Sequence, residues 1–370
     1  MRITGIALAI ILVLVAAAGG AETISLGTPA DGLSVRVAES SMEATVLQYD
    51  LGGFSRSPVD IDGKIYHRIE LEGEGLILRR GYPELPNVAR SIVIPDDAEM
   101  SLRVVSSHYV EFPGIDVAPS KGVLTRDIDP AAVAYSFAPV YEADGWYPSE
   151  VAHARDPYIM RDVRGLVVVV NPFQYNPATR TLRVYDSVTV EVTATGPGKT
   201  NVLTRRPAAL SNEFRKIYER HFLNFGDATG TRYPVVQEAG SMLVICYDDP
   251  GYLAAMQPLV DWKNQMGIPC EMVTVTDAGS TANGIASYIA QYYNDNGVTY
   301  VLLVGDAAEV PTLTASGGAS DPSYSTITAD MYPDLFVGRF SAATVPQVQT
   351  QVQRTIEYER SQQAGAAWYH

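Results

Sequence analysis

The chain has 370 residues, of which 46% are hydrophobic, and its 42 acidic and 27 basic side chains give a formal net charge of −15. This length and apolar content favour two or three folded domains over disorder, and the negative charge argues against a general nucleic-acid binder. Only 2 cysteines are present and neither belongs to a Cys-x-x-Cys pair, which excludes a disulfide framework and a structural zinc site built from thiolates.

The negative charge is concentrated in the last part of the chain. Residues 233–370 contain 14 acidic and only 4 basic side chains, whereas residues 1–232 contain 28 and 23. Such a stretch repels polyanions and suits metal cations, although a solvated acidic surface has the same composition.

The first 21 residues have the pattern of a secretory signal peptide. Arg2 precedes the apolar run Ile6–Val15, and small residues follow from Ala16 to Ala21. The apolar run is too short for a retained membrane helix, which needs roughly 20 residues. We therefore expect cleavage near Ala18 or Ala21 and an exported protein that is not held in a membrane after signal removal.

Short alternating runs broken by Pro, Gly and Asp follow, and they predict strands. Thr181–Ala194 alternates apolar and polar side chains, as a strand with one buried face does, and Gly165–Val170 is apolar on both faces. Further strands are expected at Leu33–Val37, Thr45–Tyr49, Lys64–Leu71 and Gly75–Arg79. This half of the chain is predicted to be a β-rich, sandwich-like domain.

The segments 196–200 and 226–234 are expected to be linkers. Gly196-Pro-Gly-Lys-Thr200 lacks the first glycine of a phosphate-binding loop and no helix follows it directly. Within 205–226, Phe214, Ile217, Tyr218 and Phe222 have the spacing of a short amphipathic helix.

After Gly240 strands and helices alternate. Strands are expected at Ser241–Tyr247, Cys270–Val275, Val298–Val304 and Leu335–Phe340, with helices between them and after the last. Ser280 is placed to cap the second helix, Gly267 and Gly297 to end the first two, and Pro258 either kinks the first helix or marks its start. The pattern predicts a doubly wound, mostly parallel sheet.

A group of aspartates follows the third of these strands. Asp306 leaves the strand at its carboxyl end, where such sheets hold their ligands, and Asp321, Asp330 and Asp334 follow. Carboxylate oxygens at this density favour calcium, although aspartates in loops also form turns and caps.

Several blocks in the same order resemble the catalytic domain of the gingipain-type cysteine peptidases. They are Met242-Leu-Val-Ile, Leu259-Val-Asp-Trp-Lys-Asn-Gln-Met-Gly267, Thr299-Tyr-Val-Leu-Leu-Val-Gly-Asp306, Phe336-Val-Gly-Arg-Phe-Ser341 and Arg354-Thr-Ile-Glu-Tyr-Glu-Arg360. Upstream, Gly81-Tyr-Pro-Glu-Leu-Pro86 and Tyr175-Asn-Pro177 are similar to the prodomain of the same family. The resemblance implies a signal peptide at 1–21, a β-rich prodomain at 22–204, a linker with a short helix at 205–232, and an α/β caspase-like domain at 233–370.

The resemblance also implies a function. In the family a secreted zymogen carries a prodomain that binds its own catalytic domain, and the substrates are proteins or peptides. In the family, the cleavage that releases the mature enzyme follows a basic residue, and Arg232-Tyr233 matches this pattern. The family's structural calcium site falls by resemblance on the carboxylates of Asp306, Asp330 and Asp334 and the carbonyls of Ile327 and Tyr332, with Asp334 in place of a family Glu.

The catalytic pair of the family, a cysteine and a histidine in a His-Gly segment, has no counterpart here. None of the five histidines precedes a glycine, and Cys246 and Cys270 lie in predicted strands as core thiols. We expect the pair beyond residue 370, no catalytic residue within the chain, and no peptide hydrolysis by this stretch alone.

One other class of protein stays open, and two are disfavoured. A secreted binding or adhesion protein would account for the signal peptide, the β-rich half and the missing nucleophile. A serine hydrolase needs a Gly-x-Ser-x-Gly elbow and a zinc peptidase a His-Glu-x-x-His segment, and neither occurs.

Overall fold

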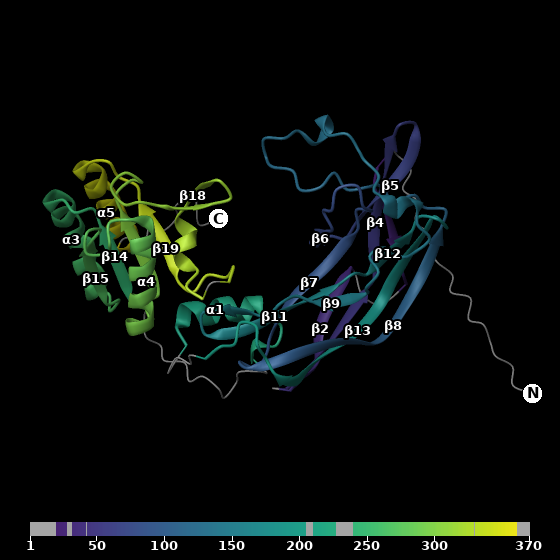
Figure 1. The fold of residues 1–370 in the computed structure, drawn as a ribbon, viewed down its shortest axis with the longest axis horizontal. Coiled ribbons are helices and arrows are strands. Elements are labelled where there is room, and N and C mark those ends of the chain that lie inside the picture. Colours follow the sequence, from purple (N-terminus) through teal and green to yellow (C-terminus); the bar gives the residue numbers. More distant parts are fainter. Residues whose placement is uncertain are drawn as a thin grey trace, which may run out of the picture. The chain divides into compact units, whose positions relative to one another are not determined.

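The computed structural model describes residues 20–27, 32–41, 43–204, 210–226, 240–328 and 330–360. The chain forms two compact units (Figure 1). The β unit holds the described residues of 1–157, 165–202 and 220–230, and the α/β unit holds those of 158–164, 203–219 and 231–370. The predicted signal peptide, apart from Gly20 and Ala21, lies outside the described residues, as do Arg232 and Tyr233.

The β unit consists of antiparallel sheets around one core. Its strands are β1 (Glu22–Ser25), β2 (Leu33–Ser40), β3 (Ala44–Leu51), β4 (Gly53–Ile61), β5 (Lys64–Glu70), β6 (Gly75–Leu76), β7 (Pro86–Val93), β8 (Ala98–Pro113), β9 (Ala152–Ala154), most of β11 (Val163–Val170), β12 (Phe173–Asn176) and β13 (Thr181–Pro197). Two short 3-10 helices lie between β8 and β9, η1 (Pro130–Ala132) and η2 (Pro139–Glu142). The long strand β13 pairs with β3, β8 and β12, and side chains from all the larger sheets share the core.

The burial of side chains in β11 and β13 agrees with the strand patterns of the sequence. Along β13 the side chains Leu182, Val184, Val188, Val190 and Val192 are buried, whereas most of the alternating polar positions are half-exposed. All eight residues of β11 are buried, as its two apolar faces predicted. The strand predicted at Gly75–Arg79 is shorter, because the chain turns at Arg79, whose carbonyl accepts a hydrogen bond from the amide of Tyr82.

The α/β unit is built on a four-stranded parallel sheet. Its elements are β10 (Tyr158–Met160), most of α1 (Asn212–His221), β14 (Met242–Cys246), α3 (Pro250–Gln265), β15 (Cys270–Thr274), α4 (Ala282–Asn296), β16 (Tyr300–Val304), β17 (Leu313–Ala315), β18 (Gly318–Ser320), η3 (Asp321–Ser325), β19 (Phe336–Phe340) and α5 (Val345–Arg360). The strand order is β15-β14-β16-β19.

Helices cover both faces of this sheet. Leu243 and Ile245 of β14 pack in one cluster with Ile285 and Ile289 of α4. Val244 and Cys246 point to the other face, where they pack in a cluster with α3 and α5. The predicted fold class, a β-rich region followed by a doubly wound, mostly parallel α/β domain, is confirmed.

The helix ends follow capping rules with one correction. Asp249 caps α3, which begins at Pro250 and contains Pro258. Gly297 ends α4 in the left-handed conformation, as predicted. The cap of α4 is Thr281 rather than Ser280, because the Thr281 hydroxyl accepts the amide of Gly284 while Ser280 has a φ of 59°.

The division into units differs from the boundaries expected at 204 and 232. Tyr158–Arg164, from within the predicted prodomain, and the helical residues up to Glu219 belong to the α/β unit. Among the described residues, no helix is both long and apolar enough to cross a membrane.

Candidate functional site

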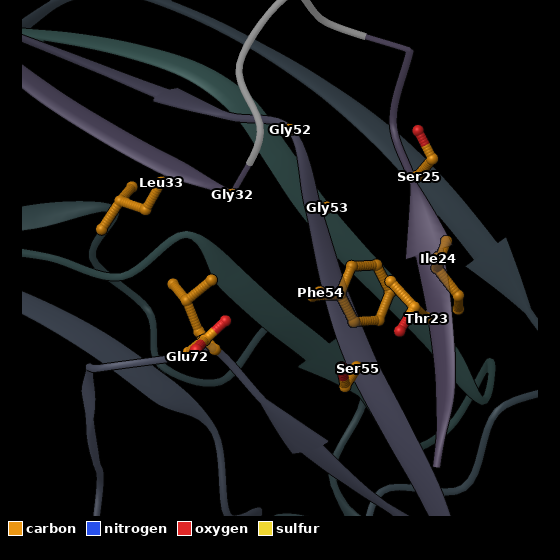
Figure 2. A pocket seen from close by; sticks show the side chains of 11 residues that line it. Thr23, Ile24, Ser25, Gly32, Leu33, Gly52, Gly53, Phe54, Ser55 and Glu72 are labelled. Atoms are coloured by element: carbon orange, nitrogen blue, oxygen red, sulfur yellow. The ribbon is translucent and has the colours of Figure 1, made fainter.

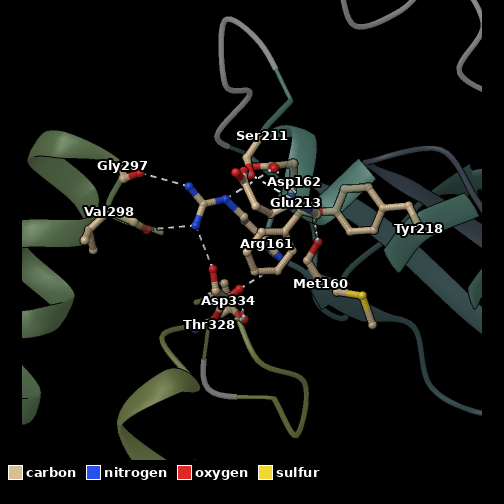
Figure 3. Close-up of polar contacts among 11 residues, drawn as sticks. Met160, Arg161, Asp162, Ser211, Glu213, Tyr218, Gly297, Val298, Thr328 and Asp334 are labelled. Carbon is tan, nitrogen blue, oxygen red and sulfur yellow. Dashed lines mark hydrogen bonds and ion pairs between the residues drawn. The ribbon is translucent and has the colours of Figure 1, made fainter. Parts of the chain in front are cut away.

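Within the α/β unit, Arg161 is enclosed by backbone acceptors (Figure 3). Its guanidinium donates to the carbonyl oxygens of Gly297 and Val298 at 2.9 Å each, and to the carbonyl of Asp334 at 2.8 Å. Gly297 caps the C-terminus of α4, so two of these acceptors lie at the negative end of a helix. The side chain of Arg161 is only 7% exposed, so its charge depends on these partners.

Arg161 also has an unusual backbone conformation. It is the first of the two turn residues between β10 and β11, and its φ is 51°. Glycine is the usual residue at a turn position with positive φ. A left-handed arginine that is also buried and fully engaged marks a position that the rest of the fold holds in place.

Asp334, on the loop before β19, is fully buried beside Arg161. Its carboxylate accepts the amides of Ile327 at 2.7 Å and Thr328 at 2.9 Å, and the amide of Arg161 at 3.1 Å. Burial raises the pKa of Asp334, and these donors act in the opposite direction.

The residues beside Arg161 contact the same loop. The amide of Ile159 donates to Asp330 Oδ2 at 2.6 Å, and the ring of Tyr158 stacks on Tyr332 with centroids 3.7 Å apart. Residues 158–161 therefore contact the loop 327–334 through main chain, side chain and ring at once.

Helix α1 closes the other side of Arg161. The ring of Phe214 lies 4.9 Å from the guanidinium carbon and packs on Phe336 of β19. The hydroxyl of Tyr218 donates to the carbonyl of Met160 at 3.1 Å, and Asp162 lies 3.4 Å from Arg161 Nε. Aromatic rings and a carboxylate thus complete the enclosure.

The structure does not bring the five predicted calcium ligands together. The amide of Asp306 bonds the carbonyl of Ala342 beyond the carboxyl ends of β16 and β19. Asp334 precedes the amino end of β19, where Tyr300 pairs with Phe336. Four residues of strand rise, roughly 13 Å, separate these two edges of the sheet.

The donors around these carboxylates also do not suit a cation. Ile327 and Tyr332 present amides, not carbonyls, to Asp334 and Asp330. Among the residues the structure describes, no three His, Cys, Asp or Glu side chains are grouped so that they could hold a metal ion. The set Asp306, Ile327, Asp330, Tyr332 and Asp334 therefore does not fit a single calcium site in this structure.

The carboxyl edge of the sheet carries a different polar group. Arg339 of β19 makes two 2.7 Å hydrogen bonds to Asp321 and donates to the carbonyls of Gly305 and Val310. The hydrogen bonds from Arg339 hold the pKa of Asp321 below its usual value. The sequence offered one signal for this pair, since Arg339 is one of only four basic residues in 233–370.

Neither cysteine has the character of a nucleophile. Cys246 is fully buried in β14, and burial raises its pKa to about 12. Cys270 is half-buried at the start of β15, with its pKa raised to about 11. A reactive thiol needs a lowered pKa.

The β unit contains a cavity of about 360 Å³ near β1 and β4 (Figure 2). Its wall includes the glycines Gly32, Gly52 and Gly53 and the ring of Phe54. Glu72 is the one titratable side chain among the described residues that line it, so no acid–base pair or ligand cage can be assigned there.

Comparison with known proteins identifies both parts of the chain. Residues 28–231 match the family model Propeptide_C25, and residues 236–370 match Peptidase family C25. Gingipain R1 of Porphyromonas gingivalis is 37% identical over 337 residues, which are 89% of this chain and 33% of the relative. Gingipain R2 of strain W83 is 38% identical over 77% of this chain and 39% of the relative.

The chain thus spans between a third and two fifths of the length of these curated relatives. Among solved structures, a complex of the pro- and mature domains of RgpB from Porphyromonas gingivalis aligns at a TM-score of 0.48. That alignment has 31% identity and covers 52% of this chain and 97% of the other. On the two family matches, the chain belongs to the C25 peptidases, with the family's propeptide region followed by sequence of its peptidase region.

Proposed function

We propose that the chain is the precursor of an exported cysteine endopeptidase that acts on proteins or peptides. The propeptide and peptidase regions follow one another in the order of a zymogen. The observation that carries the proposal is that Tyr158–Arg164, from the propeptide region, is part of the α/β unit. Such a segment suits a propeptide that binds its own peptidase domain. The export step rests on the signal-peptide pattern of residues 1–21.

The proposal places the catalytic cysteine and histidine outside these 370 residues. Both thiols have raised pKa values, and no histidine precedes a glycine. Calcium is left out of the proposal, because the five residues expected to bind it do not meet. Cleavage after Arg232 is kept as a prediction that N-terminal sequencing of the processed protein would test.

The test compares the 370-residue chain with a version extended by the coding sequence downstream. We expect the chain alone to hydrolyse no peptide and to react slowly with a thiol-alkylating inhibitor at neutral pH. The extended protein should gain peptidase activity that is lost when a cysteine of the extension is changed to alanine.

Two results would contradict the proposal. Hydrolysis by the 370-residue chain that is lost in Cys246→Ala, but kept in the matched variant Cys270→Ala, would place the nucleophile in β14. An extended protein without activity under any condition would favour the alternative, a secreted binding or adhesion protein that uses the same domains.

A further inference from the structure

The contacts of Arg161 belong to two regions of the family at once. Arg161 lies within residues 28–231, which match the propeptide model, whereas Gly297, Val298 and Asp334 lie within the peptidase match. All four residues are in the same compact unit. The hydrogen bonds of Arg161 are therefore non-covalent contacts between the propeptide region and the peptidase region.

These acceptors form a socket suited to a guanidinium group. The two terminal nitrogens of Arg161 donate hydrogen bonds to three carbonyl oxygens. The main-chain amide of Arg161 donates to Asp334 Oδ1. A lysine ammonium could not reach three acceptors arranged around a planar fork with the same geometry. The socket is thus selective for arginine on a turn.

The socket lies at the amino edge of the parallel sheet. Asp334 precedes β19, and Val298 precedes β16. Ligands and catalytic groups of such sheets collect at the opposite, carboxyl edge, where Asp306 and Arg339 are found. Arg161 therefore contacts the peptidase region at the amino edge of the sheet, opposite the edge where such sheets hold their ligands.

We propose that Arg161 is a retention anchor, which keeps the propeptide region bound to the peptidase domain after the chain between them has been cut. This inference rests on the proposed function, because it takes the two regions to be a propeptide and its peptidase domain. Its test, however, measures binding and needs no activity. The partner of the socket is an arginine-bearing turn of this same chain.

The test inserts a site for a specific protease between residues 226 and 240 of the full chain. After complete cleavage, size-exclusion chromatography shows whether the two pieces elute together, and dilution series give their dissociation constant. The variants are Arg161→Gly, Arg161→Lys and, as the matched control, Arg155→Ala. Arg155 is an exposed arginine a few residues earlier in the β unit.

Arg161→Gly tests the contribution of the side chain without changing the backbone conformation. Glycine accepts a φ of 51° without strain, so this variant keeps the turn and removes the side chain with its guanidinium. We expect the wild-type pieces and Arg155→Ala to stay together, and Arg161→Gly to weaken binding at least about 100-fold, as expected for the loss of several charge-assisted hydrogen bonds. Arg161→Lys should weaken binding at least about tenfold.

Three results would overturn the anchor. One is an unchanged dissociation constant in Arg161→Gly, and another is full binding in Arg161→Lys. The third is immediate separation of the wild-type pieces. Circular dichroism of the uncut variants checks their folding, and if Arg161→Gly does not fold, the Arg161→Lys result decides. Failure of the extended protein to hydrolyse peptides would contradict the proposed function and leave this measurement untouched.

Discussion

Arg161 has an unfavourable backbone and a favourable side-chain environment. A left-handed conformation costs a residue with a Cβ roughly 1–2 kcal/mol relative to the right-handed one. Hydrogen bonds from a charged donor are each worth about 1.5–3 kcal/mol, and Arg161 donates three from its guanidinium. The side chain therefore outweighs the backbone strain, which explains why arginine is tolerated where glycine would fit the turn.

Asp321 and Arg339 should make stability depend on pH at the acidic end. The folded pKa of Asp321 lies below its ordinary value of 3.8, so its contribution is present at higher pH and is lost as pH falls through the folded value. We expect Asp321→Asn to lower the free energy of unfolding by a constant amount between pH 7 and 5. The difference from wild type should shrink below about pH 4.

Urea unfolding of the α/β unit at a series of pH values measures this difference. Asp261→Asn, at an exposed carboxylate of α3, is the control and should change stability little at any pH. A wild-type advantage over Asp321→Asn that persists unchanged down to pH 2 would show that the ion pair does not cause it.

At the scale of elements, the sequence predicts strands from local patterns of side chains. It does not predict contacts between residues that are far apart along the chain. Alternation along β13 and apolar runs in β14 and β16 are visible within a few residues of each strand. The carbonyl of Asp334 that accepts from Arg161 lies 173 residues later, and nothing near Arg161 in the sequence points to it. The docking of β10 and α1 on the later region could therefore not be inferred.

The five residues predicted to bind calcium do not lie together in this structure for a related reason. Asp306 and Asp334 lie on one stretch of the chain, and the family resemblance predicts that they bind the same ion. In a parallel sheet, however, a residue that follows one strand and a residue that precedes the next lie at opposite edges. Closeness along the chain is thus a poor guide to closeness of ligands in this fold.

Helices α3 and α5 are joined by a polar clamp whose loss should be measurable. Glu359 of α5 accepts from Lys263 Nζ at 2.6 Å and from the Trp262 indole at 2.8 Å, and Lys263 is only 8% exposed. Glu359→Gln keeps the volume but leaves a buried ammonium without its counter-charge. We expect a loss of about 1–3 kcal/mol in the unfolding free energy of the α/β unit, measured by urea denaturation.

The matched variant for this clamp is Glu357→Gln on the same helix. Glu357 is exposed and accepts a hydrogen bond from Gln353 one turn earlier, so its change should stay within about 0.5 kcal/mol. Equal effects of the two substitutions would mean that the clamp contributes nothing beyond an ordinary surface charge.

At the scale of the whole molecule, the compact units and the family regions have different boundaries. The propeptide match ends at residue 231, but residues 158–164 and 203–219 of that region are counted with the α/β unit. Since stability in proteins is distributed over cooperative units, the amides of this segment should open with the α/β unit. Their position in the sequence would instead group them with the β unit.

Native-state hydrogen exchange can decide between these groupings when one unit is weakened selectively. Glu359→Gln lies in α5, so it should lower the protection of β14 amides such as those of Val244 and Ile245 and leave that of Val190 in β13 unchanged. We expect the amides of Ile159 and Arg161, which donate to Asp330 and Asp334, to lose protection together with β14. If their exchange instead follows Val190 in both wild type and variant, the segment opens with the β unit, and its hydrogen bonds to the loop 327–334 are too weak to hold it.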